Sequence, residues 1–230
     1  MNFIEGVIKL FSTAKYMESM MEGLKMTLII SFFAALLGLL LGILVALVSI
    51  AKGSKWMKIP QALCKLYVTV VRGTPMALQL FIMFYVIFTF RGFPEVVTAV
   101  IAFGFNSGAY VAENIRAGIL SVDIGQTEAG RALGLSSATT MFRIVIPQAI
   151  KNVIPTIGNE LIALIKETSI VSMIGMYDLT MAAKIVGSGN NMASYIVPMS
   201  VAALFYLAIV YLLTFVIKKI ERRLRSGDKR

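Results

Sequence analysis

Residues 26–51 read MTLIISFFAALLGLLLGILVALVSIA, a run of 26 residues without a charged side chain. About 20 apolar residues are enough for a helix to cross a bilayer, so this run predicts a membrane-spanning helix. Gly38 and Gly42 form a GxxxG step inside it. Such a step permits a neighbouring helix to approach closely, although glycine is also simply common in membrane helices.

The composition of the whole chain agrees with a membrane location. Of its 230 residues, 58% are hydrophobic and 15% are charged, and the mean hydropathy is +0.82, well above that of soluble domains. The formal net charge is +10, but the basic residues flank apolar runs, so we expect attraction to anionic lipid headgroups and no nucleic-acid partner. With no histidine and with Cys64 as the single cysteine, the sequence predicts neither a metal site nor an internal disulfide.

Four further apolar runs predict, together with the first, an all-α integral membrane protein with five transmembrane helices. They occupy about residues 59–90, 96–116, 144–165 and 195–217. The run 59–90 is too long for one straight helix and carries Arg-Gly-Thr-Pro at 72–75, so we interpret it as one crossing with a break. The run 144–165 is weaker because it contains Lys151, Pro155 and Glu160.

The segments that flank the spans complete a three-part organisation. Residues 1–25 carry several charges, which argues against a cleavable signal peptide and favours an amphipathic helix on the membrane surface. Residues 26–218 then form one transmembrane domain, followed by a basic tail at 219–230. Because positive loops stay in the cytoplasm, the tail and the lysines at 52–58 are expected inside. Five crossings place the N-terminus outside and the segment between the third and fourth spans in the cytoplasm.

That cytoplasmic segment predicts a short helical hairpin. Asp123 or Thr127 can cap a first helix that ends near Gly134, because glycine suits the left-handed conformation that closes a helix. Ser136 can cap a second short helix over residues 138–146. The small side chains of the hairpin favour close approach of another protein, and an ordinary structured loop is the alternative interpretation.

The hairpin sequence EAGRALGLSSATTMFRIVIPQA, residues 128–149, resembles the EAA loop of type I ABC-transporter permeases. Five positions match the pattern of that loop: Glu128, Ala129, Gly134, Ile144 and Pro147. Two positions depart from it, since Gly130 replaces the third residue of the Glu-Ala-Ala triplet and Ile146 replaces a leucine. Both changes are small or conserve volume, so the resemblance holds.

Three other stretches are similar to segments of the polar amino-acid uptake family within these permeases. They are KLYVTVVRGTPMALQLF at 65–81, NSGAYVAENIRAGILSVDIGQTEAGRALG at 106–134 and IGNELIALIKETSIVSMIG at 157–175. The resemblance implies an importer with two permease subunits, two ATP-binding subunits on the cytoplasmic face and an extracellular solute-binding protein. It also implies that the hairpin is a coupling helix that contacts the ATPase, with Glu128, Ala129, Gly130, Arg131 and Gly134 as coupling residues.

The chain itself is expected to be neither an enzyme nor a holder of cofactors. The sequence contains no GxxxxGK[ST] phosphate-binding loop, so ATP is expected to bind to the partner subunit. The HExxH pattern of zinc proteases is also missing from the sequence.

Ionisable residues inside the spans are the first candidates for contact with substrate, because an unpaired buried charge is very costly. Glu160 is expected to meet an amino group or a cationic side chain, and Arg72 to meet a carboxylate. The alternative for both is a structural ion pair, between Glu160 and Arg72 or Arg116. At the break beside Arg72, backbone groups of Thr74 are expected to line a cavity. Neutral polar candidates are Asn159, Gln79, Thr168 and Ser169, for which helix-to-helix hydrogen bonding is the alternative.

The sequence thus predicts a permease subunit of a prokaryotic cell membrane that imports polar amino acids by alternating access. Basic amino acids are slightly favoured because of the carboxylate of Glu160. A homodimer is expected, and pairing with a paralogue stays open, as do the particular amino acid and the number of substrate sites. The alternatives are a type I permease for another small polar solute and an ATP-independent carrier or channel.

Overall fold

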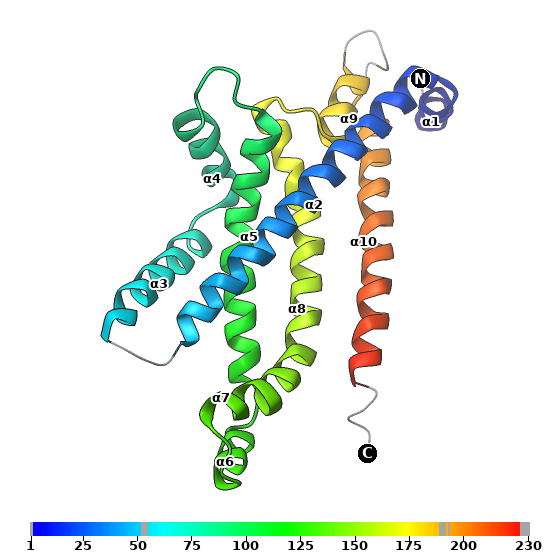
Figure 1. Ribbon diagram of the computed structural model, residues 1–230. Helices are drawn as coiled ribbons and strands as arrows, with labels where there is room; N and C mark the ends of the chain where they lie inside the picture. Colours follow the sequence, from blue (N-terminus) through cyan, green and yellow to red (C-terminus); the bar gives the residue numbers. More distant parts are fainter. Residues whose placement is uncertain (1, 52–54, 189–191, 193, 226–230) are drawn as a thin grey trace.

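The computed structural model describes residues 2–51, 55–188, 192 and 194–225, and this part of the chain is helical, without β-strands (Figure 1). The α-helices are α1 Phe3–Ser12, α2 Ala14–Ile50, α3 Lys58–Arg72, α4 Met76–Ile82, α5 Glu95–Leu120, α6 Ile124–Ala132, α7 Ser137–Thr140, α8 Ile146–Glu167, α9 Leu179–Gly187 and α10 Ile196–Arg225. Shorter 3-10 segments lie at Lys55–Met57 and Thr168–Ile174, and π-helical segments at Met83–Ile87 and Met141–Val145. The expected all-α class is confirmed.

Three helices, α2, α5 and α10, are each long and apolar enough to cross a membrane. Two bent helix pairs raise the number of candidate spans to as many as five. The first pair, within residues 55–87, bends by 108°, and the second, within residues 137–187, bends by 49°. The five expected spans correspond to the upper number. The fourth is continuous, because α8 runs through Pro155 without a break.

The first bent pair has its break where the sequence predicted one. Helix α3 ends at Arg72, Gly73 is its C-cap, and Pro75 has extended backbone angles before α4 begins at Met76. Proline disfavours the helical conformation in the residue before it and supplies no backbone donor. Gly73 and Pro75 together therefore end α3, and the chain continues into α4 in a new direction.

Helices α2 and α5 cross at very short range because glycine lies at their contact. A Cβ atom at Gly42 would lie 2.5 Å from Cγ1 of Val111, and one at Gly38 would lie 2.9 Å from Cβ of Ser107. Helix α5 contributes a glycine of its own, since a Cβ at Gly104 would lie 2.7 Å from a leucine side chain of α2. The GxxxG step of the first span is thus a site of close helix approach.

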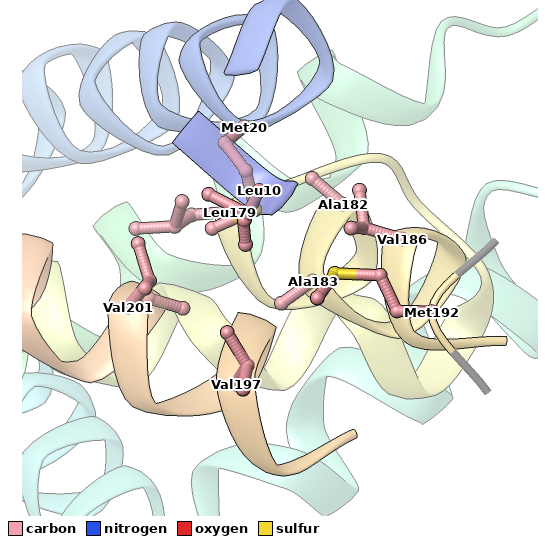
Figure 2. Close-up of a cluster of buried hydrophobic side chains, with 10 residues drawn as sticks. Leu10, Met20, Leu179, Ala182, Ala183, Val186, Met192, Val197 and Val201 are labelled. Carbon is pink, nitrogen blue, oxygen red and sulfur yellow. The ribbon is translucent and has the colours of Figure 1, made fainter. Parts of the chain in front are cut away.

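The N-terminal segment is part of the folded core at one end of the molecule. Leu10 of α1 and Met20 of α2 are buried against α9 and α10, in a cluster that includes Leu179 and Val197 (Figure 2). Helix α2 begins at Ala14, so the boundary predicted between residues 25 and 26 lies inside a helix. That α1 lies on a membrane surface stays a prediction.

The two ends of the molecule carry different segments. The hairpin with α6 and α7 lies at the same end as the last turns of α10, and α1 and α9 lie at the opposite end (Figure 1). This arrangement is the one that an odd number of crossings requires. Of the residues used to predict orientation, Lys52 and 226–230 lie outside the described residues. Which end faces the cytoplasm stays a prediction.

The contact between α2 and α5 predicts that Gly42→Leu destabilises the fold. A leucine side chain would overlap Val111, and overpacking of this kind lowers the free energy of unfolding by about 1–3 kcal/mol. Thermal unfolding of the purified protein in detergent would measure the loss. Leu44→Trp, at a side chain that is 61% exposed, is the control and should leave the transition unchanged. Equal stability of both variants would contradict the close contact.

Candidate functional site

A cavity of about 760 Å³ lies between α3, the end of α2 and α5. The lining residues are Ser49, Gln61, Cys64, Lys65, Val68, Thr69, Arg72, Gly73, Tyr110, Ala112, Glu113 and Arg116. A cavity of this volume is large enough for a small organic solute.

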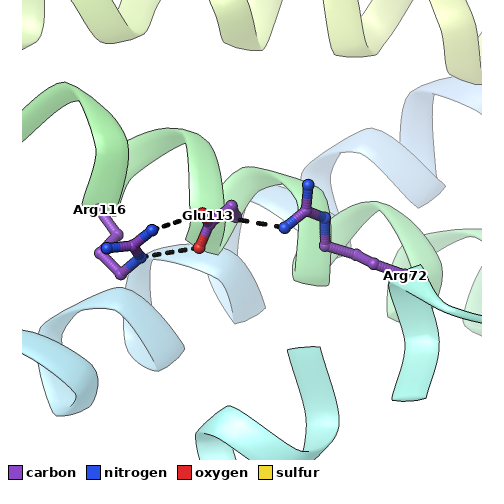
Figure 3. Close-up of polar contacts among 3 residues, drawn as sticks. All are labelled: Arg72, Glu113 and Arg116. Carbon is purple, nitrogen blue, oxygen red and sulfur yellow. Dashed lines mark hydrogen bonds and ion pairs between the residues drawn. The ribbon is translucent and has the colours of Figure 1, made fainter. Parts of the chain in front are cut away.

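Three charged residues form an ionic cluster at this cavity (Figure 3). Glu113 accepts two hydrogen bonds from Arg116, at 2.8 Å from Nε and 2.6 Å from Nη2. Nη1 of Arg72 lies 3.8 Å from Oε1 of the same carboxylate, and the Arg72 guanidinium lies 5.3 Å from the ring centroid of Tyr110. Glu113 therefore connects the end of α3 to α5.

The charges that line the cavity do not cancel. Lys65, Arg72 and Arg116 contribute three positive charges and Glu113 one negative charge, which leaves a net charge of +2. The side chains of Arg72 and Arg116 are 40% and 43% exposed, so both guanidinium groups can meet a solute. The site is thus suited to attract an anionic group such as a carboxylate.

Among the residues predicted to contact substrate, the structure places one in the lining of this cavity, namely Arg72. Glu160 lies half-buried on α8, where its side chain interacts with Ser107 of α5 and is within electrostatic range of Arg72. The ion pair considered for Glu160, with Arg72 or Arg116, does not form in the described residues. Both arginines are instead within ion-pair distance of Glu113.

Gln79 and Thr74 stabilise the break between α3 and α4. Nε2 of Gln79 donates to the carbonyl oxygens of Val71 and Thr74, at 2.8 and 3.2 Å, and lies 2.7 Å from Oγ1 of Thr74. Asn106 of α5 donates to Oε1 of Gln79 at 3.0 Å. The bonds to Val71 and Thr74 satisfy carbonyl groups at the break. The bond from Asn106 joins α5 to α4, which is the helix-to-helix hydrogen bonding that the sequence left open for Gln79.

Two of the remaining candidates lie on or just beyond α8. Asn159 is exposed, and Oγ of Ser169 donates to the carbonyl oxygen of Lys166 at 2.8 Å. Neither residue lines the cavity. The structure therefore places Asn159 and Ser169 outside the cavity that Arg72 lines.

Sequence reasoning missed Glu113, although its signal was present. Glu113 and Arg116 are three residues apart inside the third predicted span, which is the spacing of an ion pair on one helix face. The argument that selected Glu160, an ionisable residue inside a span, applies equally to Glu113. What the sequence did not reveal was that Arg72, from another helix, lies beside it.

The hairpin between α5 and α8 has the caps that the sequence predicted. The Asp123 side chain accepts from the backbone N–H of Gly125 at 2.7 Å, and Ser136 accepts from that of Thr139 at 3.1 Å. Gly134 has the left-handed φ of +80°. The second helix differs from the expectation, because α7 continues through a π-helical segment into α8 and has no end near residue 146.

The hairpin is stabilised by packing of α6 against α7 and the π-helical segment that follows α7. Gly130 is buried, and a Cβ atom there would lie 2.7 Å from Cγ2 of Thr140 and 3.0 Å from Cδ1 of Ile144. Glycine at this position, the departure from the Glu-Ala-Ala triplet, thus lets α6 pack closely. The side chain of Arg131 donates to the carbonyl oxygen of Leu135 and closes the turn.

The outer surface of the hairpin is partly apolar. Glu128 and Ala129 are exposed, and Leu133 beside them is 81% exposed. Ile124 and Phe142 are also exposed. Sequence reasoning emphasised small residues here and missed the exposed apolar side chain of Leu133, which directly follows the last residue of α6.

Comparison with known proteins places the chain among transport proteins. Residues 38–226 match the family described as binding-protein-dependent transport system inner membrane component. The chain is 40% identical to the arginine transport system permease protein ArtQ of Bacillus subtilis (strain 168), over 94% of this chain and 97% of that one. It is 35% identical to the glutamine transport system permease protein GlnP of Escherichia coli (strain K12), over 90% and 93%. A crystal structure of an amino acid ABC transporter with histidines superposes with a TM-score of 0.85 at 39% identity, covering 93% and 98%.

The hydrogen bonds at the break predict that Gln79→Leu lowers stability. The variant leaves carbonyl groups of Val71 and Thr74 without their side-chain donor, at a cost of about 1–3 kcal/mol. Thermal unfolding measures this cost, with Leu78→Ala, at an exposed neighbouring position, as the control. If Gln79→Leu kept full stability and changed only the choice of substrate, Gln79 would be a substrate contact after all.

Proposed function

The chain belongs to the family of binding-protein-dependent transport system inner membrane components, and from this premise we propose that it is the transmembrane permease subunit of an ATP-driven importer of polar amino acids. The observation that carries the proposal is the match over nearly the whole length of both chains to permease proteins of arginine and glutamine transport systems. The helical fold with three to five candidate spans supports the same function.

The substrate proposed for the cavity is the carboxylate end of an amino acid. Arg72 offers a guanidinium that is suited to two parallel hydrogen bonds with a carboxylate, and the net positive charge of the lining favours an anion. Glu160, half-buried on α8, is proposed to meet the ammonium group or a cationic side chain. A carboxylate in that position favours basic amino acids.

The partners are proposed from the family and from the hairpin surface. Leu133 and Ile124 expose apolar side chains next to the polar Glu128 and Arg131, and a mixed surface of this kind is suited to contact another protein. We assign the hairpin to the ATP-binding subunit on the cytoplasmic face, so the N-terminus lies outside. A second copy of this chain and an extracellular solute-binding protein complete the proposed importer of a prokaryotic cell membrane.

Reconstitution into liposomes tests this function. The permease together with its ATPase and solute-binding protein should take up polar amino acids only when ATP is present, and the permease alone should give no uptake. A panel of amino acids, a dipeptide and an organic anion identifies the substrate class. Uptake by the permease alone would instead indicate an ATP-independent carrier or channel, and uptake of the other solutes alone would replace the amino-acid assignment.

Arg72→Gln is expected to reduce amino-acid uptake while the complex still assembles. Loss of a charge-assisted contact with the substrate carboxylate corresponds to about 10- to 100-fold weaker binding. Initial uptake rates over a range of substrate concentrations provide the measurement. The control is Arg91→Gln, the same change in an exposed turn before α5. Full uptake by Arg72→Gln would exclude this residue from the site.

Gly134→Trp is expected to abolish coupling to ATP while folding is preserved. Apart from its two chain neighbours, no described residue has an atom within 4 Å of a Cβ at Gly134, so the side chain fits within the subunit but protrudes from the hairpin. The left-handed backbone costs about 1–2 kcal/mol for any residue other than glycine.

Gly92→Trp is the matched control for this backbone strain. Gly92 has φ +82° and equally open surroundings, but it lies in the turn before α5 and outside the hairpin. The ATPase activity that substrate stimulates should fall in Gly134→Trp and persist in Gly92→Trp. Normal transport by Gly134→Trp would refute the assignment of the hairpin.

A further inference from the structure

The two contacts of the Glu113 carboxylate are unequal in strength. Arg116 holds both carboxylate oxygens at hydrogen-bond distance, from three residues further along the same helix. Arg72 approaches one oxygen at 3.8 Å, beyond the range of a hydrogen bond. The pair within α5 is therefore the tight one, and the contact between α3 and α5 is the one that can open.

Arg72 has hydrogen-bonding capacity that these contacts leave unused. A guanidinium carries five N–H donors. In the described part of the chain, the contacts of this group are the long ion pair with Glu113 and the ring of Tyr110. The side chain is 40% exposed and lines the cavity. A carboxylate that entered the cavity would find these donors available.

The charge of the cluster matches the charge of one incoming carboxylate. Arg72 and Arg116 carry two positive charges and Glu113 one negative charge, so the empty cluster has a net charge of +1. One further carboxylate makes the cluster neutral. Because Arg116 holds both oxygens of Glu113, this residue stays paired when Arg72 turns to another partner. None of the three charged side chains is then left without a counter-ion after the exchange.

We propose that Glu113 is a displaceable internal counter-ion, which holds Arg72 in the empty permease and gives way to the carboxylate of the substrate. This inference rests on the proposed function, because it takes the substrate to be an amino acid. Glu113 competes with the substrate for the same guanidinium. It therefore weakens binding and promotes release into the cytoplasm. Glu113 is a positioning residue that acts through Arg72 and does not itself bind the substrate.

The experiment uses the whole transporter complex and compares two probes. L-arginine carries a carboxylate, and agmatine is the same molecule without it. If the uptake panel identifies another amino acid, that amino acid and its decarboxylated amine take their place. Equilibrium binding is measured on wild-type complex and on complex with Glu113→Gln, together with the dependence of initial transport rates on substrate concentration.

Glu113→Gln should bind L-arginine about 10-fold more tightly than wild type, because a competing charge has been removed from the guanidinium. The maximal transport rate should fall, because release becomes slower. Binding of agmatine should not tighten. A purely structural role of Glu113 predicts the opposite, namely weaker binding of both probes and a less stable complex.

Two further variants make the test independent of any folding defect. Glu113→Asp keeps the charge and the pairing with Arg116 but shortens the side chain, which draws the carboxylate away from Arg72. Its affinity for L-arginine should lie between those of wild type and Glu113→Gln. Glu95→Gln makes the same amide substitution in the exposed first turn of α5 and should behave as wild type.

The outcomes distinguish a failure of the counter-ion assignment from a failure of the proposed function. If the wild-type complex binds no amino acid, the proposed function is wrong. If wild type binds an amino acid and both Glu113 variants bind it equally or more weakly, the counter-ion assignment is wrong. Tightening that occurs equally for agmatine would also overturn it, since the effect would then be unrelated to the carboxylate.

Discussion

Charged and polar groups inside the membrane need partners from the protein itself, because hydrocarbon offers none. This constraint governs the region where α3 ends. The break at Pro75 removes helical partners from nearby carbonyl groups, and Gln79 supplies donors in their place. Arg72, left at the end of α3, lies beside Glu113 on α5. The polar contacts around Arg72 and Gln79 therefore follow from the break between α3 and α4.

Local patterns were sufficient to predict much of the fold. The uncharged run at 26–51 gave the first span, and the Arg-Gly-Thr-Pro break gave the bend of the second, because hydropathy and proline act within a few residues of their own position. The helix N-caps at Asp123 and Ser136 could be predicted for the same reason. The extension of α2 back to Ala14 was missed, because burial against α9 and α10 stabilises a segment that its charges alone would place at the surface.

The candidate site was predicted less completely, since it depends on distant parts of the chain. Arg72 was identified from its position in a span. Its neighbour Glu113 comes from another helix, and the role of Gln79 depends on which carbonyl groups the break exposes. Glu160 was expected to meet the substrate, with an ion pair to Arg72 or Arg116 as the alternative, and that ion pair does not form among the described residues. Spacing along the sequence identifies ionisable residues in a span, but only packing of α3 and α8 on α5 decides which of them meet.

The helical backbone continues from α7 into α8, so the hairpin is joined to α8 without an intervening loop. Helical structure extends from Ser137 through the π-helical segment Met141–Val145 to Glu167, and α8, with 22 residues, is roughly 33 Å long at about 1.5 Å per residue. Because Gly130 has no side chain, α6 packs closely against Thr140 and Ile144 at the hairpin end of this helix. A tilt of α8 by about 5° at its hairpin end would move its far end by roughly 3 Å on this length. Because no loop separates the hairpin from α8, a small displacement of the hairpin can reposition Glu160, which lies on α8.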